Sequence, residues 1–420
     1  MGIIAKSSFN LKDLLFLIEP CFHGNRYVKV GKKIGCRIII IRRPNGPPIP
    51  DDDLEEIHAN VLNPESIILA INKVKRDTYY KRIAVLPGNE YCVPAYAVVT
   101  KRLNKKGNSP EAALAARNKT NMREALNISS INCPKSQTFS NIADILNYSD
   151  TFKYPVVVKP PDMACSMFVK LVYNKEQLLD LAKKIFSRTD NLIDYPLDNR
   201  VLVEEYVHGP EFSVELFLEN GQLKFASVTE KYKGSIPFFV ELGHVVPSSI
   251  TTNEQNQLLI NAAYKAALGV GLMMGPMHIE IVLTDTGPSI IEIAARLGGG
   301  QIMELLRIAW NIDLPLTTIY QAFGYSWGSK QYSDSVRGAA IRFITADPGR
   351  VIDIVGIENA KKKNGVINVT LDVEQGDYVN PVKDNEGRVG HVIAIGKNSK
   401  IAKRRAWESA NLIKIITMEE

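Results

Sequence analysis

Two glutamates in the stretch MHIEIVLTDTGPSIIEIAARLGGG (277–300) are the residues whose type and spacing best suit chemistry. Two β-rich runs flank residues 285–287, which predicts a hairpin with a three-residue loop. The register set by that loop places Glu280 directly opposite Glu292, with both side chains on one face of the sheet. Like charges that face each other destabilise a sheet, so we expect the pair to hold a cation.

Oxygen ligands of this kind suit a hard divalent cation. Mg²⁺ accepts one or two protein carboxylates and takes its other ligands from water and substrate phosphates, so the pair predicts a metal site for a phosphate-bearing substrate. A second interpretation is that both glutamates are solvated on an exposed face. The apolar residues of the two strands occupy the opposite face and leave that exposure open: Ile279, Ile281, Ile291 and Ile293.

Arg296 and the glycine run 298–300 follow the second glutamate closely. A guanidinium beside a metal can clamp a carboxylate or stabilise charge on a transferring phosphoryl group. Glycines let backbone N–H groups approach an anion. The alternative is that Arg296 only neutralises the two glutamates in a structural network.

These residues need a sheet to hold them, and the rest of the chain alternates strands and helices. The first hundred residues predict a small α/β domain that opens with a βαβ unit. Its expected strands are 13–19, 36–41 and 83–86, its helices are 23–34 and 64–75, and its surface loop is 44–53.

The pattern changes at Ser109. A Ser cap followed by Pro starts one helical run over 109–126, which carries Arg117, Lys119 and Arg123. A β-rich region follows, and then an amphipathic helix and a further segment within 301–324. Residues 337–420 are interpreted as a separate group of short strands after a linker at 327–335. The expected elements in between are strands at 154–159, 201–206, 211–218 and 222–229 and helices at 175–186 and 253–268.

Composition bounds the class of protein. The chain has 420 residues, 45% of them apolar and 23% charged, which predicts two to four globular domains. Its net charge of +6 is spread along the chain and does not indicate nucleic acid. The five cysteines include no CxxC pair, so neither a disulfide framework nor a zinc site is expected. The apolar run 14–18 is too short for export or for a membrane span, which favours a cytoplasmic protein.

A second signature, VLVEEYVHGPEFSVE (201–215), is a strand that ends in acidic residues before a Gly-Pro turn. Together with the lysine that ends YPVVVK (154–159) and the Glu280/Glu292 hairpin, it resembles the ATP-grasp superfamily over essentially the whole chain. The resemblance is closest to bacterial L-amino acid ligases and carnosine-synthase-like enzymes. It implies an α/β (α+β) ATP-grasp fold. The implied domains are a Rossmann-like N-terminal pre-ATP-grasp domain (1–105), an ATP-grasp domain (106–330) with a lid at about 155–205, and a β-rich C-terminal domain (331–420).

The resemblance also implies roles for individual residues. Lys119 and Lys159 would contact the ATP phosphates, and Ser166 lies in the loop that covers them. Glu280 and Glu292 would hold Mg²⁺, for which Mn²⁺ could substitute. The adenine would bind at Glu204, Glu205 and the backbone of Val207, and the ribose at Glu211. The substrate and catalytic residues would be Glu90, Lys231, Glu241, His244, Arg296, Gly299 and Gly300, whereas His208 and His278 are taken as structural.

The function implied is an ADP-forming carboxylate–amine ligase that joins L-amino acids through an acyl phosphate. Its partners would be small molecules, with no nucleic acid or membrane and with a homodimer left open. Two departures stand out: Ala294 replaces a metal-binding Asn, and the phosphate loop PPDMACSMFV (160–169) contains no glycine. Two alternatives therefore remain, a ligase for a carboxylic acid that is not an amino acid and a nucleotide-binding module without turnover. Gly300 is expected to leave space beside Arg296.

Overall fold

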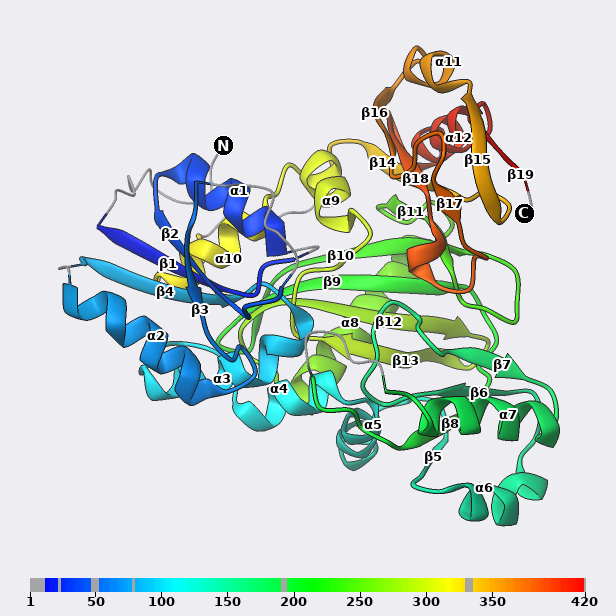
Figure 1. Ribbon diagram of the computed structural model, residues 1–420, viewed down its shortest axis with the longest axis horizontal. Coiled ribbons are helices and arrows are strands. Elements are labelled where there is room, and N and C mark those ends of the chain that lie inside the picture. The colour runs from blue at the N-terminus through cyan, green and yellow to red at the C-terminus, as the bar shows by residue number, and fades with distance from the viewer. Residues whose placement is uncertain are drawn as a thin grey trace.

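The computed structural model describes residues 12–21, 24–46, 53–77, 80–189, 195–328 and 335–418. The N-terminal part is a four-stranded parallel sheet in the order β3-β2-β1-β4 with helices packed on it, which is the Rossmann-like arrangement predicted (Figure 1). The core strand is a continuous apolar run, Leu14–Ile18, without an exposed residue. The elements are β1 (Asp13–Ile18), α1 (Asn25–Ile34), β2 (Arg37–Arg42), β3 (Glu55–His58), α2 (Pro64–Asp77), β4 (Arg82–Pro87), η2 (Glu90–Cys92) and α3 (Val93–Arg102). Part of the predicted loop 44–53 lies outside the described residues.

The helical run expected over 109–126 is two helices, α4 (Pro110–Arg117) and α5 (Lys119–Ile128). Asn118 between them has extended backbone angles, and its side chain accepts hydrogen bonds from the first-turn N–H groups of α5. A residue that can cap a new helix therefore ends the old one, because its side chain competes with the helical backbone. The break places Lys119 at the start of α5.

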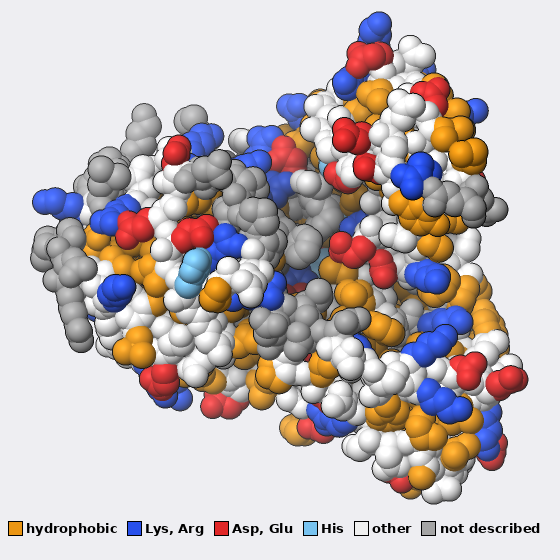
Figure 2. Space-filling view, in the orientation of Figure 1, with side chains coloured by type: hydrophobic (Ala, Val, Ile, Leu, Met, Phe, Trp, Pro, Cys, Tyr) orange, Lys and Arg blue, Asp and Glu red, His pale blue; other side chains and the backbone are white. Residues whose placement is uncertain are grey.

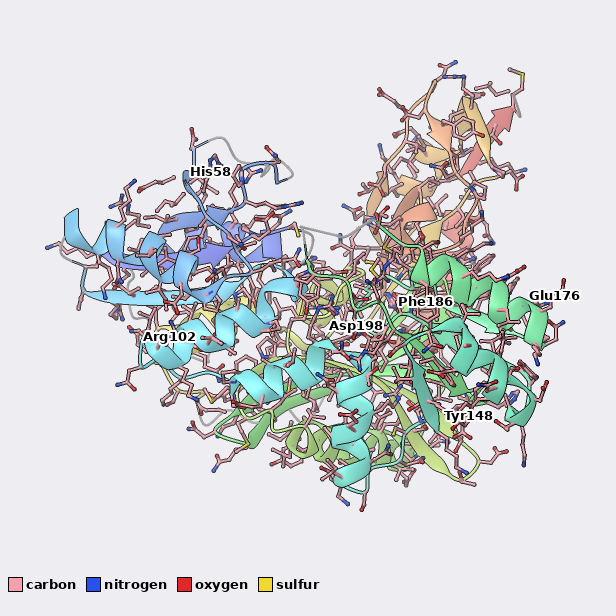
Figure 3. All side chains as sticks on the ribbon, turned by 60° about the horizontal axis from the view of Figure 1, so that its bottom comes forward. His58, Arg102, Tyr148, Glu176, Phe186 and Asp198 are labelled. Carbon is pink, nitrogen blue, oxygen red and sulfur yellow. The ribbon has the colours of Figure 1, made fainter. Side chains whose placement is uncertain are left out.

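A four-stranded antiparallel sheet, the lid sheet, follows in the order β5-β8-β6-β7. It extends beyond the predicted lid range of 155–205, because its edge strand β5 begins at residue 136. Tyr148, Glu176 and Phe186 on its helices lie far from His58 and Arg102 of the N-terminal part (Figure 3). Its elements are β5 (Ser136–Phe139), α6 (Ile142–Tyr148), η3 (Ser149–Thr151), β6 (Val156–Lys159), β7 (Lys170–Val172), α7 (Lys175–Phe186) and β8 (Val201–Glu205).

The largest sheet has eight strands in the order β13-β12-β9-β10-β11-β14-β18-β16. The expectation of a separate C-terminal group of strands is wrong in part, because β14 pairs with β11 and continues the central sheet. Only β17, β15 and β19 form a sheet of their own. The strands are β9 (Glu211–Glu219), β10 (Gln222–Lys233), β11 (Glu241–Val246), β12 (Gly275–Thr284), β13 (Gly287–Ala294), β14 (Gly338–Ile344), β15 (Gly349–Val355), β16 (Val366–Leu371), β17 (Tyr378–Val379), β18 (Gly390–Gly396) and β19 (Lys414–Met418).

Helices cover both faces of the central sheet. α8 (Asn253–Gly269) packs its alanines on the apolar face of β9, β12 and β13. α9 (Ile302–Trp310) and α10 (Leu314–Ala322) cover the other face and join the sheet to α1 and β1 in one core. Because side chains alternate along a strand, the acidic residues of β9 and β12 point away from α8. The remaining elements are α11 (Ile357–Lys361), η5 (Asn385–Gly387) and α12 (Ser399–Ala410). Most of the predicted linker, 329–334, lies outside the described residues.

The face of the molecule shown in Figure 2 has no single dominant charge. Lys and Arg side chains alternate with acidic and apolar ones over the face in Figure 2, which is notched between the C-terminal strands and the N-terminal part. Within the described residues no helix combines the length and the apolar character needed to cross a bilayer.

Candidate functional site

The hairpin of β12 and β13 brings the two predicted metal ligands together. Its turn is Asp285 and Thr286 alone, because Thr284 pairs with Gly287, so the predicted three-residue loop is wrong. A bulge between Glu280 and Ile281 corrects the register, and Glu280 lies opposite Glu292 as predicted.

The bulge also changes the apolar face. Ile291 is the extra residue and is only half-buried, and Ile290 packs in the core in its place. The carbonyl of Ile291, freed from the regular ladder, accepts a hydrogen bond from Arg123 Nη2 at 2.6 Å. The prediction that the apolar residues lie opposite the glutamates is confirmed for Ile279, Ile281 and Ile293, which pack in the core, and is wrong for Ile291, which the bulge displaces.

The two glutamates are neither freely solvated nor deeply buried. Their side chains are 21% (Glu280) and 24% (Glu292) exposed. Lys231 Nζ lies 2.7 Å from Glu280 Oε1, and Lys119 Nζ lies 3.2 Å from Glu292 Oε2. No third His, Cys, Asp or Glu completes a metal-binding group with them within the described chain. The pair is thus held open to solvent on one side and neutralised by lysines on the other.

Lys231 on β10 is the centre of an acidic cluster. Its buried ammonium group lies within 2.8 Å of carboxylate oxygens of Glu211, Glu241 and Glu280. Burial lowers the pKa of Lys231, but the three carboxylates outweigh burial and raise it well above its usual value. Burial raises the pKa of Glu241, but the charge of Lys231 outweighs burial and lowers that pKa to about 2. Four of the predicted nucleotide, metal and substrate residues therefore share one charge network.

His278, interpreted as structural from the sequence, holds Glu280 in position. Its Nδ1 lies 2.8 Å from Glu215 Oε1 and its Nε2 lies 3.4 Å from Glu280 Oε1. Burial lowers the pKa of His278, but the charge of Glu215 and hydrogen bonds to both carboxylates raise it to about 10. The imidazolium is therefore paired with Glu280, one of the two predicted metal ligands. The spacing of two residues between His278 and Glu280 on one strand was the available signal.

Replacing His278 by Gln is expected to remove a pH-dependent part of the stability. The folded-state pKa is raised above the value of about 6.5 in the unfolded chain. The contribution of His278 is thus complete below pH 6.5 and is lost as the pH rises through 10. Urea denaturation at pH 6.5, 8 and 9.5 should show a gap between wild type and variant, on the order of a few kcal/mol, that shrinks with rising pH. A gap that stays constant would contradict the assignment.

Glu204 at the end of β8 forms a buried ion triad. Arg123 Nε lies 2.7 Å from Glu204 Oε1, and Lys159 Nζ lies 2.6 Å from Glu204 Oε2. Burial raises the pKa of Glu204, but the two cations lower it below its usual value. Arg123 was noted on the helical run but given no role. It lies four residues after Lys119, on the same face of α5, which was the signal available.

Three predicted site residues lie outside these networks of charged side chains: Glu205, Val207 and Ser166. The side chain of Glu205 accepts a hydrogen bond from the backbone N–H of Lys135, at the edge of the lid sheet. Val207 lies in the irregular stretch between β8 and β9, as does His208, which the sequence took as structural. Ser166 Oγ donates to the carbonyl of Phe239 at 3.3 Å.

The glycine-free phosphate loop still adopts the backbone that glycine favours. Cys165, Ser166 and Phe168 all have φ near +60°. Non-glycine residues enter this left-handed region at a cost of about 1–2 kcal/mol each. The loop is anchored by Lys119, whose Nζ donates to the carbonyl of Met163 at 2.8 Å.

Arg296 is bound by Glu90, which lies on η2 of the N-terminal part. Arg296 Nε donates to Glu90 Oε2 at 2.7 Å, and Arg117 Nη1 lies 3.8 Å from Glu90 Oε1. Burial raises the pKa of Glu90, but Arg296 and Arg117 lower it to about 2. Arg296 therefore forms its ion pair with Glu90 and not with Glu280 or Glu292, which argues against the alternative in which it only neutralises those two glutamates.

His244 on β11 is fully buried, and neither ring nitrogen has a hydrogen-bond partner within the described residues. Its Nε2 lies 3.5 Å from Glu241 Oε2. Burial lowers the pKa of His244 to about 4, so the ring is neutral near pH 7. A Cβ at Gly300 would lie 2.6 Å from His244 Nε2, whereas at Gly299 it would meet nothing within 4 Å. The expectation that Gly300 leaves space is therefore wrong, because the His244 ring occupies the space where a side chain at residue 300 would begin. The open space lies beside Gly299.

Gly300→Ala is expected to destabilise the fold. Gly300 has φ +54°, where Ala costs about 1–2 kcal/mol, and the new methyl group would collide with a buried ring. We expect a loss of about 2–4 kcal/mol in the free energy of unfolding, measured by denaturant titration. Gly299→Ala is the matched control and should change the value by less than about 1 kcal/mol. Equal effects of the two variants would show that His244 does not occupy this direction.

The C-terminal part also contacts the site, which the sequence did not indicate. Arg388 Nη1 donates to the carbonyl of Glu241 at 3.4 Å, and Asn385 Oδ1 accepts from the N–H of Glu241 at 2.9 Å. The backbone N–H of Asn385 donates to the carbonyl of Cys165 at 3.4 Å. More than 140 residues separate Glu241 from these partners, so no local pattern could reveal them.

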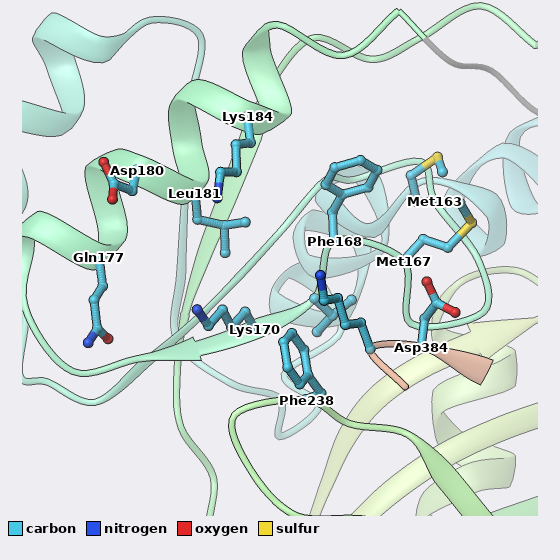
Figure 4. Close-up of a pocket in the computed structure, with 12 residues that line it drawn as sticks. Met163, Met167, Phe168, Lys170, Gln177, Asp180, Leu181, Lys184, Phe238 and Asp384 are labelled. Carbon is cyan, nitrogen blue, oxygen red and sulfur yellow. The ribbon is translucent and has the colours of Figure 1, made fainter. Parts of the chain in front are cut away.

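A cavity of about 610 Å³ lies beside the lid sheet and contains none of the predicted site residues (Figure 4). It lies between α7, β7 and the phosphate loop, and its lining includes Phe238, Lys170 and, from the C-terminal part, Asp384. Lys170 Nζ lies 5.8 Å from the centre of the Phe238 ring. The predicted site residues therefore lie in the charge networks described above and not in this cavity.

Comparison with known proteins agrees with this geometry. The ATP-grasp domain family matches residues 152–304, and L-amino acid ligase C-terminal domain 2 matches residues 342–418. Dapdiamide A synthase from Enterobacter agglomerans is 26% identical over 96% of both chains. Human carnosine synthase 1 is 29% identical over 43% of this chain, which spans only 22% of that protein's length. A solved L-amino acid ligase from Bacillus licheniformis superposes with a TM-score of 0.81 over 98% of this chain and 100% of its own, at 20% identity. The chain therefore contains an ATP-grasp domain and a C-terminal domain of the L-amino acid ligase type, and it shares the fold of a solved L-amino acid ligase.

Proposed function

We propose that this ligase joins the carboxyl group of one L-amino acid to the amine of another, with ATP as the energy source. The observation that carries the proposal is the pair Glu280 and Glu292, which face each other at the solvent edge of a network of buried cations. A triphosphate needs positive charge and a divalent ion where phosphoryl transfer occurs. An amide bond between amino acids is the product class that the C-terminal domain family and the relatives support.

The carboxylate pair fits Mg²⁺. Both ligands are carboxylate oxygens, and both glutamates are partly exposed. Burial raises the pKa of Glu280, but Lys231 and other neighbours lower it well below its usual value, so this carboxylate is charged. Mg²⁺ commonly takes two protein carboxylates and completes its shell with phosphate oxygens and water. When bound there, it would neutralise charge on the β- and γ-phosphates. Ala294 offers no further ligand, so Glu280 and Glu292 would be the protein's whole contribution.

The lysines around the pair would then contact the nucleotide. Lys119 and Lys159 would neutralise the phosphates, beneath the phosphate loop that carries Ser166. The carboxylate of Glu204 is already paired with Arg123 and Lys159, so adenine would be recognised by backbone groups between Glu204 and Val207. We assign the ribose to Glu211, and Glu205 would shape the rim.

The chemical step is direct transfer. One carboxylate oxygen of the acid substrate attacks the γ-phosphorus, the bond from that phosphorus to the β–γ bridging oxygen breaks, and ADP leaves. The amine then attacks the carbonyl carbon of the acyl phosphate, loses a proton and expels phosphate. Arg296, oriented by Glu90, would stabilise the oxygen charge in both steps, and the neutral ring of His244 beside Glu241 would accept the amine proton. Gly299 would leave room for the acid substrate.

The proposal is tested with the full-length protein, ATP, Mg²⁺ and pairs of the twenty L-amino acids. Phosphate release that requires amino acids, ADP rather than AMP, and a dipeptide mass in the product are the expected results. Phosphate release that depends only on other carboxylic acids would favour a ligase for an acid outside the amino acids. ATP binding without ADP formation under any of these conditions would contradict the proposal and favour a module without turnover.

A further inference from the structure

Arg388 follows η5 in the C-terminal part and lies beside the proposed acyl-transfer site. Its Nε donates to the carbonyl of Asn385 at 2.7 Å and its Nη1 to the carbonyl of Glu241 at 3.4 Å. The guanidinium carbon lies 4.0 Å from the centre of the Phe343 ring. The backbone and an aromatic face therefore fix the direction of this side chain without a salt bridge.

Arg388 differs from the other cations of the site. Lys119, Lys159, Lys231 and Arg296 each have a carboxylate within hydrogen-bonding distance or close to it. No carboxylate among the described residues forms an ion pair with Arg388, and burial lowers its pKa more than the charges of acids such as Glu241 raise it. A partly buried guanidinium without an acid partner is costly, and binding of an anion would relieve that cost.

The surroundings place Arg388 on the substrate side of the site. The Phe343 ring packs edge-on against the His244 ring with 5.6 Å between centres, and a Cβ at Gly300 would touch both rings. The backbone N–H of Asn385, three residues before Arg388, donates to the carbonyl of Cys165 at 3.4 Å, which ties this segment to the phosphate loop. Glu90 already pairs with Arg296, whereas Arg388 has only backbone acceptors among the described residues.

We infer that Arg388 binds the α-carboxylate of the amine substrate, the carboxylate that is not activated in the reaction. This assignment rests on the proposed function. The planar guanidinium suits a carboxylate bound through two oxygens, and its attachment to the Glu241 backbone places it next to the residues assigned to the amine. The acceptor would therefore be a free amino acid, and a carboxamide or a simple amine would be a poor substitute.

The experiment compares an acceptor amino acid with its carboxamide in the full-length protein. The best amino acid pair from the screen serves as reference, and kcat and KM for the acceptor are measured by phosphate release and product mass. Wild type should prefer the free acid by roughly 30-fold or more in kcat/KM, mostly through KM. Arg388→Gln should lose that preference while its kcat with the carboxamide stays near that of wild type. Arg388→Lys should retain part of it.

A structural role for Arg388 would lower activity with both acceptors equally, and that result would overturn the inference. Arg404→Gln removes a charge from the same part of the chain at an exposed position, 67% accessible, and should leave the preference unchanged. If Arg388→Gln changes the selectivity for a second carboxylate on the acid substrate instead, the assignment to the amine is wrong. If wild type couples no amine at all, the proposed function itself fails.

Discussion

Glu292→Gln is expected to lower amino-acid-dependent phosphate release by roughly 10³-fold or more while the fold stays intact. The amide keeps the size of the side chain but removes the charge that faces Glu280 and that Lys119 now neutralises at 3.2 Å. Because the variant lacks one anionic ligand, the Mg²⁺ concentration that gives the half-maximal rate should be much higher than for wild type. Initial rates over a Mg²⁺ titration, with circular dichroism as the check on folding, measure both effects.

Asp285→Asn is the matched control for this prediction. Asp285 is exposed in the turn of the same hairpin and loses the same charge, but it lies outside the charge networks of the site. Its rate and its Mg²⁺ dependence should equal those of wild type. A Glu292→Gln enzyme with normal rates would show that the carboxylate pair is not the metal site.

Lys231→Met is expected to destabilise the protein by about 3–5 kcal/mol, because it leaves an acidic cluster without its central cation. Glu211, Glu241 and Glu280 all lie within 2.8 Å of the Lys231 ammonium group. The methionine fills the same space, so the loss reports charge rather than volume. Urea denaturation at pH 7.5 measures the free energy of unfolding.

Two comparisons separate this electrostatic effect from a packing effect. Lys224→Met removes a lysine from the same strand whose nearest acid, Glu219, is 3.8 Å away, and should cost less than about 1 kcal/mol. In Lys231→Met the crowded carboxylates should have raised pKa values, so the folded state binds more protons and the variant recovers stability as the pH falls toward 5. Adding Glu211→Gln should also restore part of the loss. A defect that is independent of pH would contradict this account.

The roles assigned to individual residues remain predictions, but the geometry behind them can be compared with the sequence. The pairing of Glu280 with Glu292 was predicted from a three-residue loop and a regular ladder, whereas the structure reaches the same pairing with a two-residue turn and a bulge. The loop length was not predicted, because the carbonyl that the bulge at Ile291 frees is bound by Arg123 of α5, which is far away in the sequence. Similarly, capping by Asn118 ended a helix that periodicity alone would have continued.

The sequence by itself determined elements that neighbouring residues define: the strands of the first βαβ unit and of the hairpins, the starts of α2, α7 and α8, and the order of motifs that marks an ATP-grasp ligase. Tertiary structure alone decided which charges meet. Arg388 reaches the backbone of Glu241, Glu90 reaches Arg296, and β14 extends the central sheet, each across a long stretch of chain. The reason is physical: backbone geometry specifies contacts between near neighbours, whereas contacts between distant segments depend on how whole layers pack, and a charged side chain carries no local pattern that names its partner.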